Sequence, residues 1–115
     1  MKENLIADKS KQFAIRIIRL YQHLTENGRE FVLSKQILRS GTSIGANVRE
    51  AIQAQSRKDF IAKMQIALKE ASETEYWLEL LHETDYLSDK EYESIAADCA
   101  SINKILISIV KTSRS

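Results

Sequence analysis

Apolar residues recur at intervals of three and four along most of this chain, which is the spacing of one face of an α-helix. Four segments carry the pattern, and short stretches without it separate them. The first two run over about Asp8–Glu26 and about Glu30–Ala54, while Ser56 and Ser88 open the third and fourth. The sequence therefore predicts four amphipathic helices.

Each segment has one stripe of apolar or small residues that we expect to face a common core. In the last two stripes, steps of four and three alternate over about three heptads, which is typical of helices packed in a left-handed bundle. The four stripes are Phe13, Ile17, Leu20 and Leu24; Ile37, Gly41, Ile44, Val48 and Ala51; Phe60, Met64, Ala67, Ala71, Thr74, Leu78 and Leu81; and Tyr92, Ile95, Cys99, Ile102, Leu106 and Ile109.

Short joints with start and stop signals connect these segments. Gly28 is placed to end the first helix. Ser56 with Asp59, and Ser88 with Glu91, match the capping box, in which a serine and an acidic residue three positions later bond the free N–H groups of the first turn. Because short joints favour antiparallel neighbours, we expect an all-α fold, an antiparallel up-down-up-down four-helix bundle.

The second segment contains two glycines, Gly41 and Gly45, in its middle. Inside a helix each glycine costs about 1 kcal/mol relative to alanine, so packing must offset that cost. Small residues four apart would let another backbone approach closely. A break at Gly41, with Thr42 or Ser43 capping a new helix, explains the same residues, and helix propensity does not choose between the two.

The first and last helices carry more apolar residues than one core-facing stripe holds. In the first helix, Ile15, Ile18 and Tyr21 lie away from the stripe. Contiguous exposed apolar surface marks an interface, so we expect self-association through the first helix, the last helix or both. The alternative is a few scattered surface isoleucines. In the last helix the apolar residues spread over roughly 200°: Ile95, Cys99, Ile102, Ile105, Leu106, Ile107, Ile109 and Val110.

Length and composition fit this architecture. The chain has 115 residues, no proline and three glycines, so residues 1–115 are expected to form a single helical domain. No apolar run approaches the roughly 20 residues needed to cross a bilayer, and no secretory signal opens the chain, which predicts a cytoplasmic protein without a membrane partner. The single cysteine, Cys99, falls on an apolar stripe, where we expect a buried structural role.

Charge is unevenly distributed, although the net charge is only +1. Residues 1–58 contain eleven Lys/Arg and five Asp/Glu, whereas residues 59–115 contain six and eleven. This asymmetry indicates either a basic binding face or complementary surfaces that meet in an assembly, and the sequence does not choose between them.

Two long motifs resemble a known family. They are QILRSGTSIGANVREA over Gln36–Ala51, and SRKDF over Ser56–Phe60 followed by IALKEASETEYWL over Ile66–Leu78. In this order they resemble the four-helix-bundle proteins encoded in intervening sequences of bacterial 23S ribosomal RNA genes. The resemblance covers nearly the whole chain, and it implies a continuous second helix with a small-residue face and a ring-shaped homopentamer, but no defined activity.

A related branch of that family, the accessory proteins of diversity-generating retroelements, forms similar pentameric barrels that bind a reverse transcriptase and nucleic acid. Nothing in this chain places it in that branch, so the analogy bears on the fold alone.

The motifs also carry polar residues for which we expect structural roles. Glu70 and Glu73 share a helix face, so they can pair with Arg39 across the bundle or at a subunit contact. His23 and His82 are not expected to supply the Glu-x-x-His elements of a di-iron bundle. The structural set is Asn47, Glu50, Glu70, Glu73 and Thr74.

We expect no catalysis, no metal and no cofactor. No nucleophile, general base and orienting group can be assembled from the motifs, and Gly41 and Gly45 do not follow a strand as a phosphate-binding loop would require. Tyr76 and Trp77 are conceivable platforms for base stacking, but aromatic residues on a bundle helix more often fill a core or an interface.

The functional hypothesis with most support is a basic surface, with His23 beside it on the first helix. Repeated around a ring, such a surface would bind phosphate backbones without sequence preference and in a salt-sensitive way. The sequence suggests a homo-oligomeric accessory factor that binds RNA, DNA or a nucleic-acid-processing protein; the alternatives are a solvated face with ordinary ion pairs and a protein–protein scaffold without a nucleic-acid role. The candidate contacts are Lys9, Arg16, Arg19, Lys35, Arg39 and Arg49.

Overall fold

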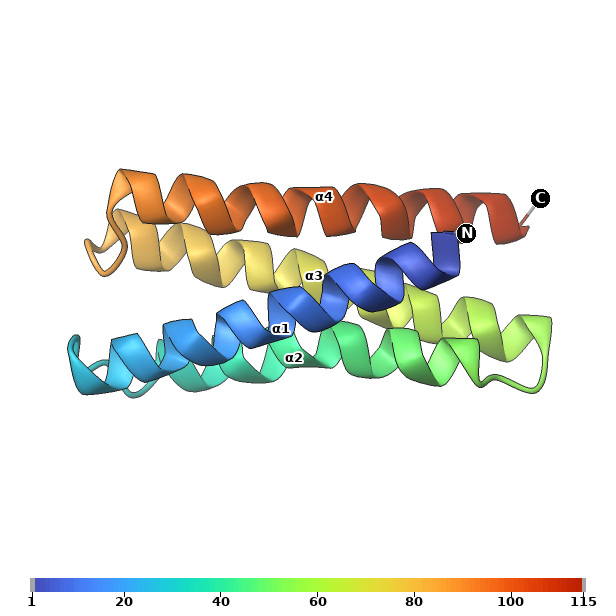
Figure 1. Ribbon diagram of the computed structural model, residues 1–115, viewed down its shortest axis with the longest axis horizontal. Helices are drawn as coiled ribbons and strands as arrows, with labels where there is room; N and C mark the ends of the chain where they lie inside the picture. The colour runs from blue at the N-terminus through green and yellow to red at the C-terminus, as the bar shows by residue number, and fades with distance from the viewer. Residues whose placement is uncertain (1, 115) are drawn as a thin grey trace.

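The computed structural model describes residues 2–114, and most of them lie in four α-helices (Figure 1). The helices are α1 (Lys2–Glu26), α2 (Leu33–Ile52), α3 (Arg57–Glu83) and α4 (Asp89–Arg114), and the described residues contain no strand. Each helix packs against the next one along the chain, and α4 packs against α1. The antiparallel up-down-up-down bundle predicted from the sequence is therefore the observed fold.

Two helices begin at other residues than predicted. α1 starts at Lys2 rather than near Asp8, because Ile6 extends the core stripe by one heptad and is fully buried. α2 starts at Leu33, and Glu30 lies before it as a cap. The Glu30 carboxylate accepts hydrogen bonds of 2.7 to 3.2 Å from the backbone N–H groups of residues 32–34. Burial raises the pKa of Glu30, but these hydrogen bonds outweigh burial and hold the pKa below its ordinary value.

The predicted capping box of α4 is confirmed, while Ser56 caps α3 through one of the two expected bonds. Ser56 Oγ accepts a hydrogen bond of 3.0 Å from the backbone N–H of Asp59. Ser88 Oγ accepts one of 3.1 Å from the N–H of Glu91, whose carboxylate in turn accepts one of 2.9 Å from the N–H of Ser88. Hydrogen bonding of the Glu91 carboxylate to the backbone and the side chain of Ser88 lowers the pKa of Glu91, although burial opposes this effect.

The stop signal after α1 works differently from the prediction. α1 ends at Glu26, but the left-handed residue of the turn is Arg29, with φ of 51°, and not Gly28. At Gly28 the constraint is space, because a Cβ there would lie 2.9 Å from the carbonyl oxygen of Leu24. The glycine therefore allows a tight turn through its missing side chain.

The four predicted stripes form the core, with Phe60 and Tyr92 partly buried and the other members buried. The expected apolar surplus of α4 is largely wrong, because α4 packs between α1 and α3 and these two neighbours cover a wide stripe. Only Ile107 remains strongly exposed, at 51%. α1 does keep a surplus, since three of its apolar side chains are 38 to 47% exposed: Leu5, Ile15 and Ile18.

α2 runs without a break through both of its central glycines. Both positions face α1. A Cβ at Gly41 would lie 2.7 and 2.8 Å from the two branches of the fully buried Ile17 side chain. A Cβ at Gly45 would lie 3.4 Å from the backbone oxygen of Ser10, which is an ordinary contact distance. Gly41 therefore lets Ile17 enter the α1/α2 interface, whereas Gly45 leaves room for a methyl group.

The two glycines should respond in opposite directions to alanine. Gly41→Ala gains helix propensity but forces Ile17 to move in a packed core, so we expect a net loss of about 1 to 2 kcal/mol in the free energy of unfolding. Gly45→Ala should leave stability unchanged or raise it by up to about 1 kcal/mol. Urea denaturation at one protein concentration measures both. Equal losses in the two variants would contradict this account of the α1/α2 contact.

Candidate nucleic-acid interface

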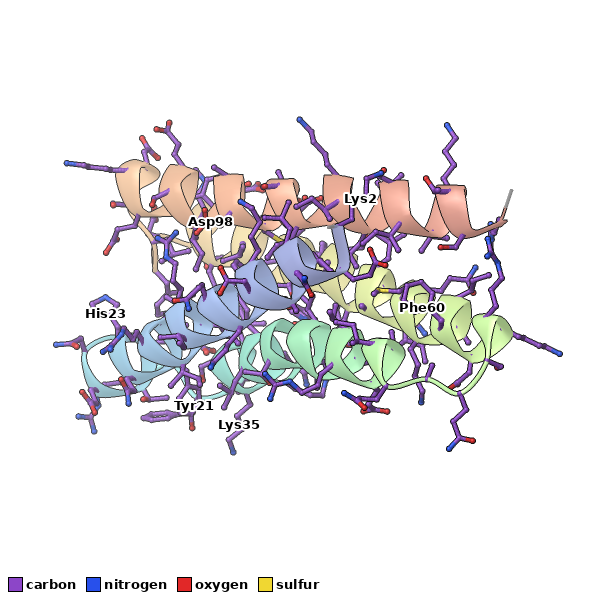
Figure 2. The ribbon with its side chains drawn as sticks, turned by 45° about the vertical axis from the view of Figure 1, so that its right-hand side comes forward. Lys2, Tyr21, His23, Lys35, Phe60 and Asp98 are labelled. Carbon is purple, nitrogen blue, oxygen red and sulfur yellow. The ribbon has the colours of Figure 1, made fainter. Side chains whose placement is uncertain are left out.

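The six basic residues predicted to contact nucleic acid do not share one surface. Figure 2 shows Lys35 pointing away from the bundle on the α2 side, opposite the side on which Asp98 of α4 lies. The set divides into cations that bond within the bundle and cations that stay unpaired at its surface. Lys9, Arg16 and Arg19 lie on the α4 side of α1, Arg49 lies beside a groove between α1 and α2, Arg39 turns toward α3, and Lys35 is exposed on α2.

Long polar side chains join α1 to α4 along what we term the α1/α4 seam. Among neighbouring helices, this pair has the sparsest packing. Arg16 binds Asp98 at 2.6 Å and donates to Ser94 Oγ at 3.0 Å. The cations recur every seven residues along α1 and the serines every seven residues along the antiparallel α4, so the same kind of bond repeats once per heptad. The three pairs are Lys2 with Ser108, Lys9 with Ser101, and Arg16 with Ser94.

Arg39 joins α2 to α3 through two carboxylates. Its guanidinium contacts Glu70 at 2.8 Å and also binds Glu73, which accepts a hydrogen bond of 3.0 Å from Trp77 Nε1. The Trp77 bond, followed by the bond from Arg39, holds the pKa of Glu73 below its ordinary value although burial opposes both. Glu73 and Glu70 in turn raise the pKa of Arg39. The charge of Arg39 is therefore largely neutralised within the chain.

The remaining polar residues of the two motifs also lie along α2 and α3. Thr74 is fully buried and forms a hydrogen bond of 2.8 Å with the buried Ser40 hydroxyl across the α2/α3 interface. Glu50 pairs with Lys63 of α3 at 3.2 Å. Asn47 bonds within α2, to a backbone carbonyl one turn earlier. Of the five residues for which a structural role was expected, all but Asn47 thus connect α2 to α3.

Three cations of the predicted set have no such partner. Among residues 2–114, the side chains of Arg19, Lys35 and Arg49 form no ion pair or hydrogen bond, and all three residues are exposed. Arg49 lines a groove of about 470 Å³ between α1 and α2, whose other walls include the small residues Ala14 and Gly45. These three cations are the ones whose charge faces solvent.

The histidine prediction is wrong in one respect, because Glu79 stands three residues before His82 and the two form one Glu-x-x-His element. His82 Nε2 lies 2.7 Å from Asp89, and its ring stacks on Tyr92 with centroids 4.2 Å apart. Within the described part of the chain, no cluster of three His, Cys, Asp or Glu residues could hold a metal. Burial raises the pKa of the Cys99 thiol to about 12, which makes it a poor nucleophile at neutral pH.

The family model of the 23S rRNA-intervening sequence protein matches residues 2–108, which extend from α1 well into α4. The chain belongs to this family. The two motifs that suggested the relationship lie on α2 and α3, where their polar residues form the contacts described above. In this member of the 23S rRNA-intervening sequence family, Arg39, Glu70 and Glu73 of the two motifs join α2 to α3.

A solved structure supports the same placement. The chain is similar to a protein of unknown function from the S23 ribosomal protein family of Bacteroides thetaiotaomicron VPI-5482, with a TM-score of 0.95 and 65% sequence identity over 96% of this chain and 99% of that chain. No curated protein matches the chain. Neither the family description nor that of the solved structure names a catalytic activity. Within residues 2–114, no helix has the length and apolar character needed to span a membrane.

The Glu73 cluster gives a pH-dependent signal that can be measured directly. Trp77 is the only tryptophan, so its fluorescence should report protonation of Glu73 with a midpoint below 4.5, the ordinary value for a glutamate. Because the folded-state pKa is lowered, Glu73 stabilises the fold above its ordinary pKa, and this contribution is lost as the pH falls through the lowered value. Arg39→Ala should move the midpoint upward. Glu73→Gln should abolish the transition, and its persistence would contradict the assignment.

Proposed function

We propose that this protein is a non-catalytic, cytoplasmic homo-oligomer, pentameric as the family resemblance implies, that acts as an accessory factor by binding ribosomal RNA or a similar nucleic acid. The observation that carries the proposal is the separation of charge between the two halves of the bundle. α1 and α2 contain eight Lys/Arg and four Asp/Glu, whereas residues 57–114 contain eight and eleven. A basic half attracts a phosphate backbone without reading its sequence.

Three of the six candidate cations are the best placed to contact phosphates. Arg19, Lys35 and Arg49 are exposed and unpaired among the described residues, so they can meet phosphates without breaking an existing bond. Lys9 and Arg16 lie in the α1/α4 seam, and they add to the positive field while holding the bundle together. Arg39 belongs to the α2/α3 contact with Glu70 and Glu73 and contributes least.

Self-association is supported by α1. Leu5, Ile15 and Ile18 of α1 remain 38 to 47% exposed, while a different face of the same helix packs in the core. Ala7 and Ala14 lie on the same helix and line the α1/α2 groove, where small residues allow close approach of another chain. The same exposed apolar residues favour the second candidate function, a protein–protein scaffold without nucleic acid.

RNA binding separates the two candidate functions. We expect an RNA hairpin to bind more weakly as salt rises, and we expect Arg19→Glu, Lys35→Glu and Arg49→Glu together to lower its affinity at least tenfold and the salt slope by about 3. Fluorescence anisotropy at two salt concentrations measures both effects.

The matched control reverses three cations of α3 and α4, Lys58, Lys104 and Arg114, to glutamate, which changes the net charge equally. Salt-independent RNA binding, or an equal loss of RNA affinity in both triple variants, would contradict the nucleic-acid role. The protein–protein scaffold would then be the remaining candidate function.

The oligomer can be tested independently. Light scattering should give a solution mass about five times the 13.2 kDa of one chain. Ile15→Gln with Ile18→Gln should reduce this mass, because both side chains lose an apolar contact surface, whereas Ile107→Gln on α4 should not. A wild-type chain that stays at 13.2 kDa across micromolar concentrations would refute self-association.

A further inference from the structure

The α1/α4 seam does not close along its whole length. Figure 1 shows that the N-terminal end of α1 lies beside α4, whereas the C-terminal end of α1 lies beside α2. The series of bonds between cations and serines stops at Arg16 and Ser94. One heptad further along, His23 of α1 and Leu87 before α4 take the corresponding positions, and among the described residues no hydrogen bond joins the two helices there.

A groove of about 460 Å³ occupies this open end. Its floor is aliphatic, since Leu20, Leu87 and Ile95 belong to the core but remain 9, 5 and 5% exposed. Most other core residues are fully covered. This floor offers a small apolar surface, and it lies between two adjoining helices, as in the recognition of a helix by a groove.

The rim of the groove is cationic. Arg16, Arg19 and Lys90 line it together with one carboxylate, that of Glu91. Glu91 is held in the capping box of α4 by its bonds with Ser88, so its charge is directed toward the helix start. Arg16 is paired with Asp98, whereas Arg19 and Lys90 form no ion pair or hydrogen bond within residues 2–114. The positive charge at the rim therefore exceeds the negative charge.

We propose that the groove at the open end of the α1/α4 seam binds an acidic amphipathic helix of a partner protein. Apolar side chains of that helix would cover Leu20, Leu87 and Ile95, and its carboxylates would pair with Arg19 and Lys90. A nucleic acid suits the site less well, because the floor has no aromatic ring on which a base could stack. The inference goes beyond the proposed function and does not depend on RNA binding.

The experiment uses the full chain and a synthetic helical peptide of about 18 residues, with three leucines on one face and glutamates beside them. Fluorescence anisotropy should show saturable binding, and Arg19→Glu with Lys90→Glu should weaken it at least tenfold. Neither side chain has a partner among residues 2–114, so the double variant should fold, which circular dichroism checks. The control Lys35→Glu with Arg49→Glu carries the same charge change on the α2 side and should change peptide affinity less than twofold.

Two altered peptides test the two features of the groove. Replacing the leucines by serine should abolish binding through loss of the floor contact, and replacing the glutamates by lysine should abolish it through repulsion at the rim. Absence of binding by the original peptide, equal binding of the lysine peptide, or equal losses in both double variants would overturn the proposal. A fall in the solution mass of Arg19→Glu with Lys90→Glu would also overturn it, because a second copy of this chain would then be the occupant.

Failure of RNA binding leaves the peptide result unaffected, since the two measurements use different ligands. If RNA binds and the peptide does not, the proposed function stands and this inference falls.

Discussion

The close contact between α1 and α2 at Gly41 determines the arrangement of the other helices around α1. Because Gly41 has no side chain, the branched side chain of Ile17 occupies space that a Cβ would fill. α1 therefore lies tightly against α2, and its packing against α4 on the other side is the sparsest of the neighbouring pairs. Long side chains bridge that side, and the groove lies beyond the last cation–serine pair.

The same geometry decides what each cation does. Lys9 and Arg16 face the α1/α4 seam and reach a serine or a carboxylate, so their charge serves the fold, whereas Arg19 at the open end of the seam reaches neither. Arg39 meets two carboxylates because Glu70 and Glu73 share the face of α3 that packs beside α2. Such half-exposed pairs contribute little individually. Their larger effect is on the surface charge, because they neutralise some of the six candidate cations and leave the charge of the others facing solvent.

The sequence predicted the fold well because periodicity and capping are local properties. The buried stripes, the continuous pattern of α3 and the Ser88 cap all follow from residues within one helix or one turn. The cation–serine pairs could not be predicted, although their heptad spacing is visible in the sequence. The relative alignment of α1 and α4 depends on the packing of α2 and α3, which separate the two helices along the chain. The surplus assigned to α4 failed for the same reason, since coverage depends on two neighbouring helices and not on the width of one stripe.

These features make α1 the helix on which the surface properties converge. Its α2 side borders a groove lined by small residues, its α4 side borders a groove with a cationic rim, and its outer face keeps exposed isoleucines. The fully buried polar side chains Ser10, Ser34, Ser40 and Thr74 all hydrogen bond within the chain, so none of these four is left unpaired in the core. The exposed faces of α1 offer charge, apolar area and shape within a few turns of one another.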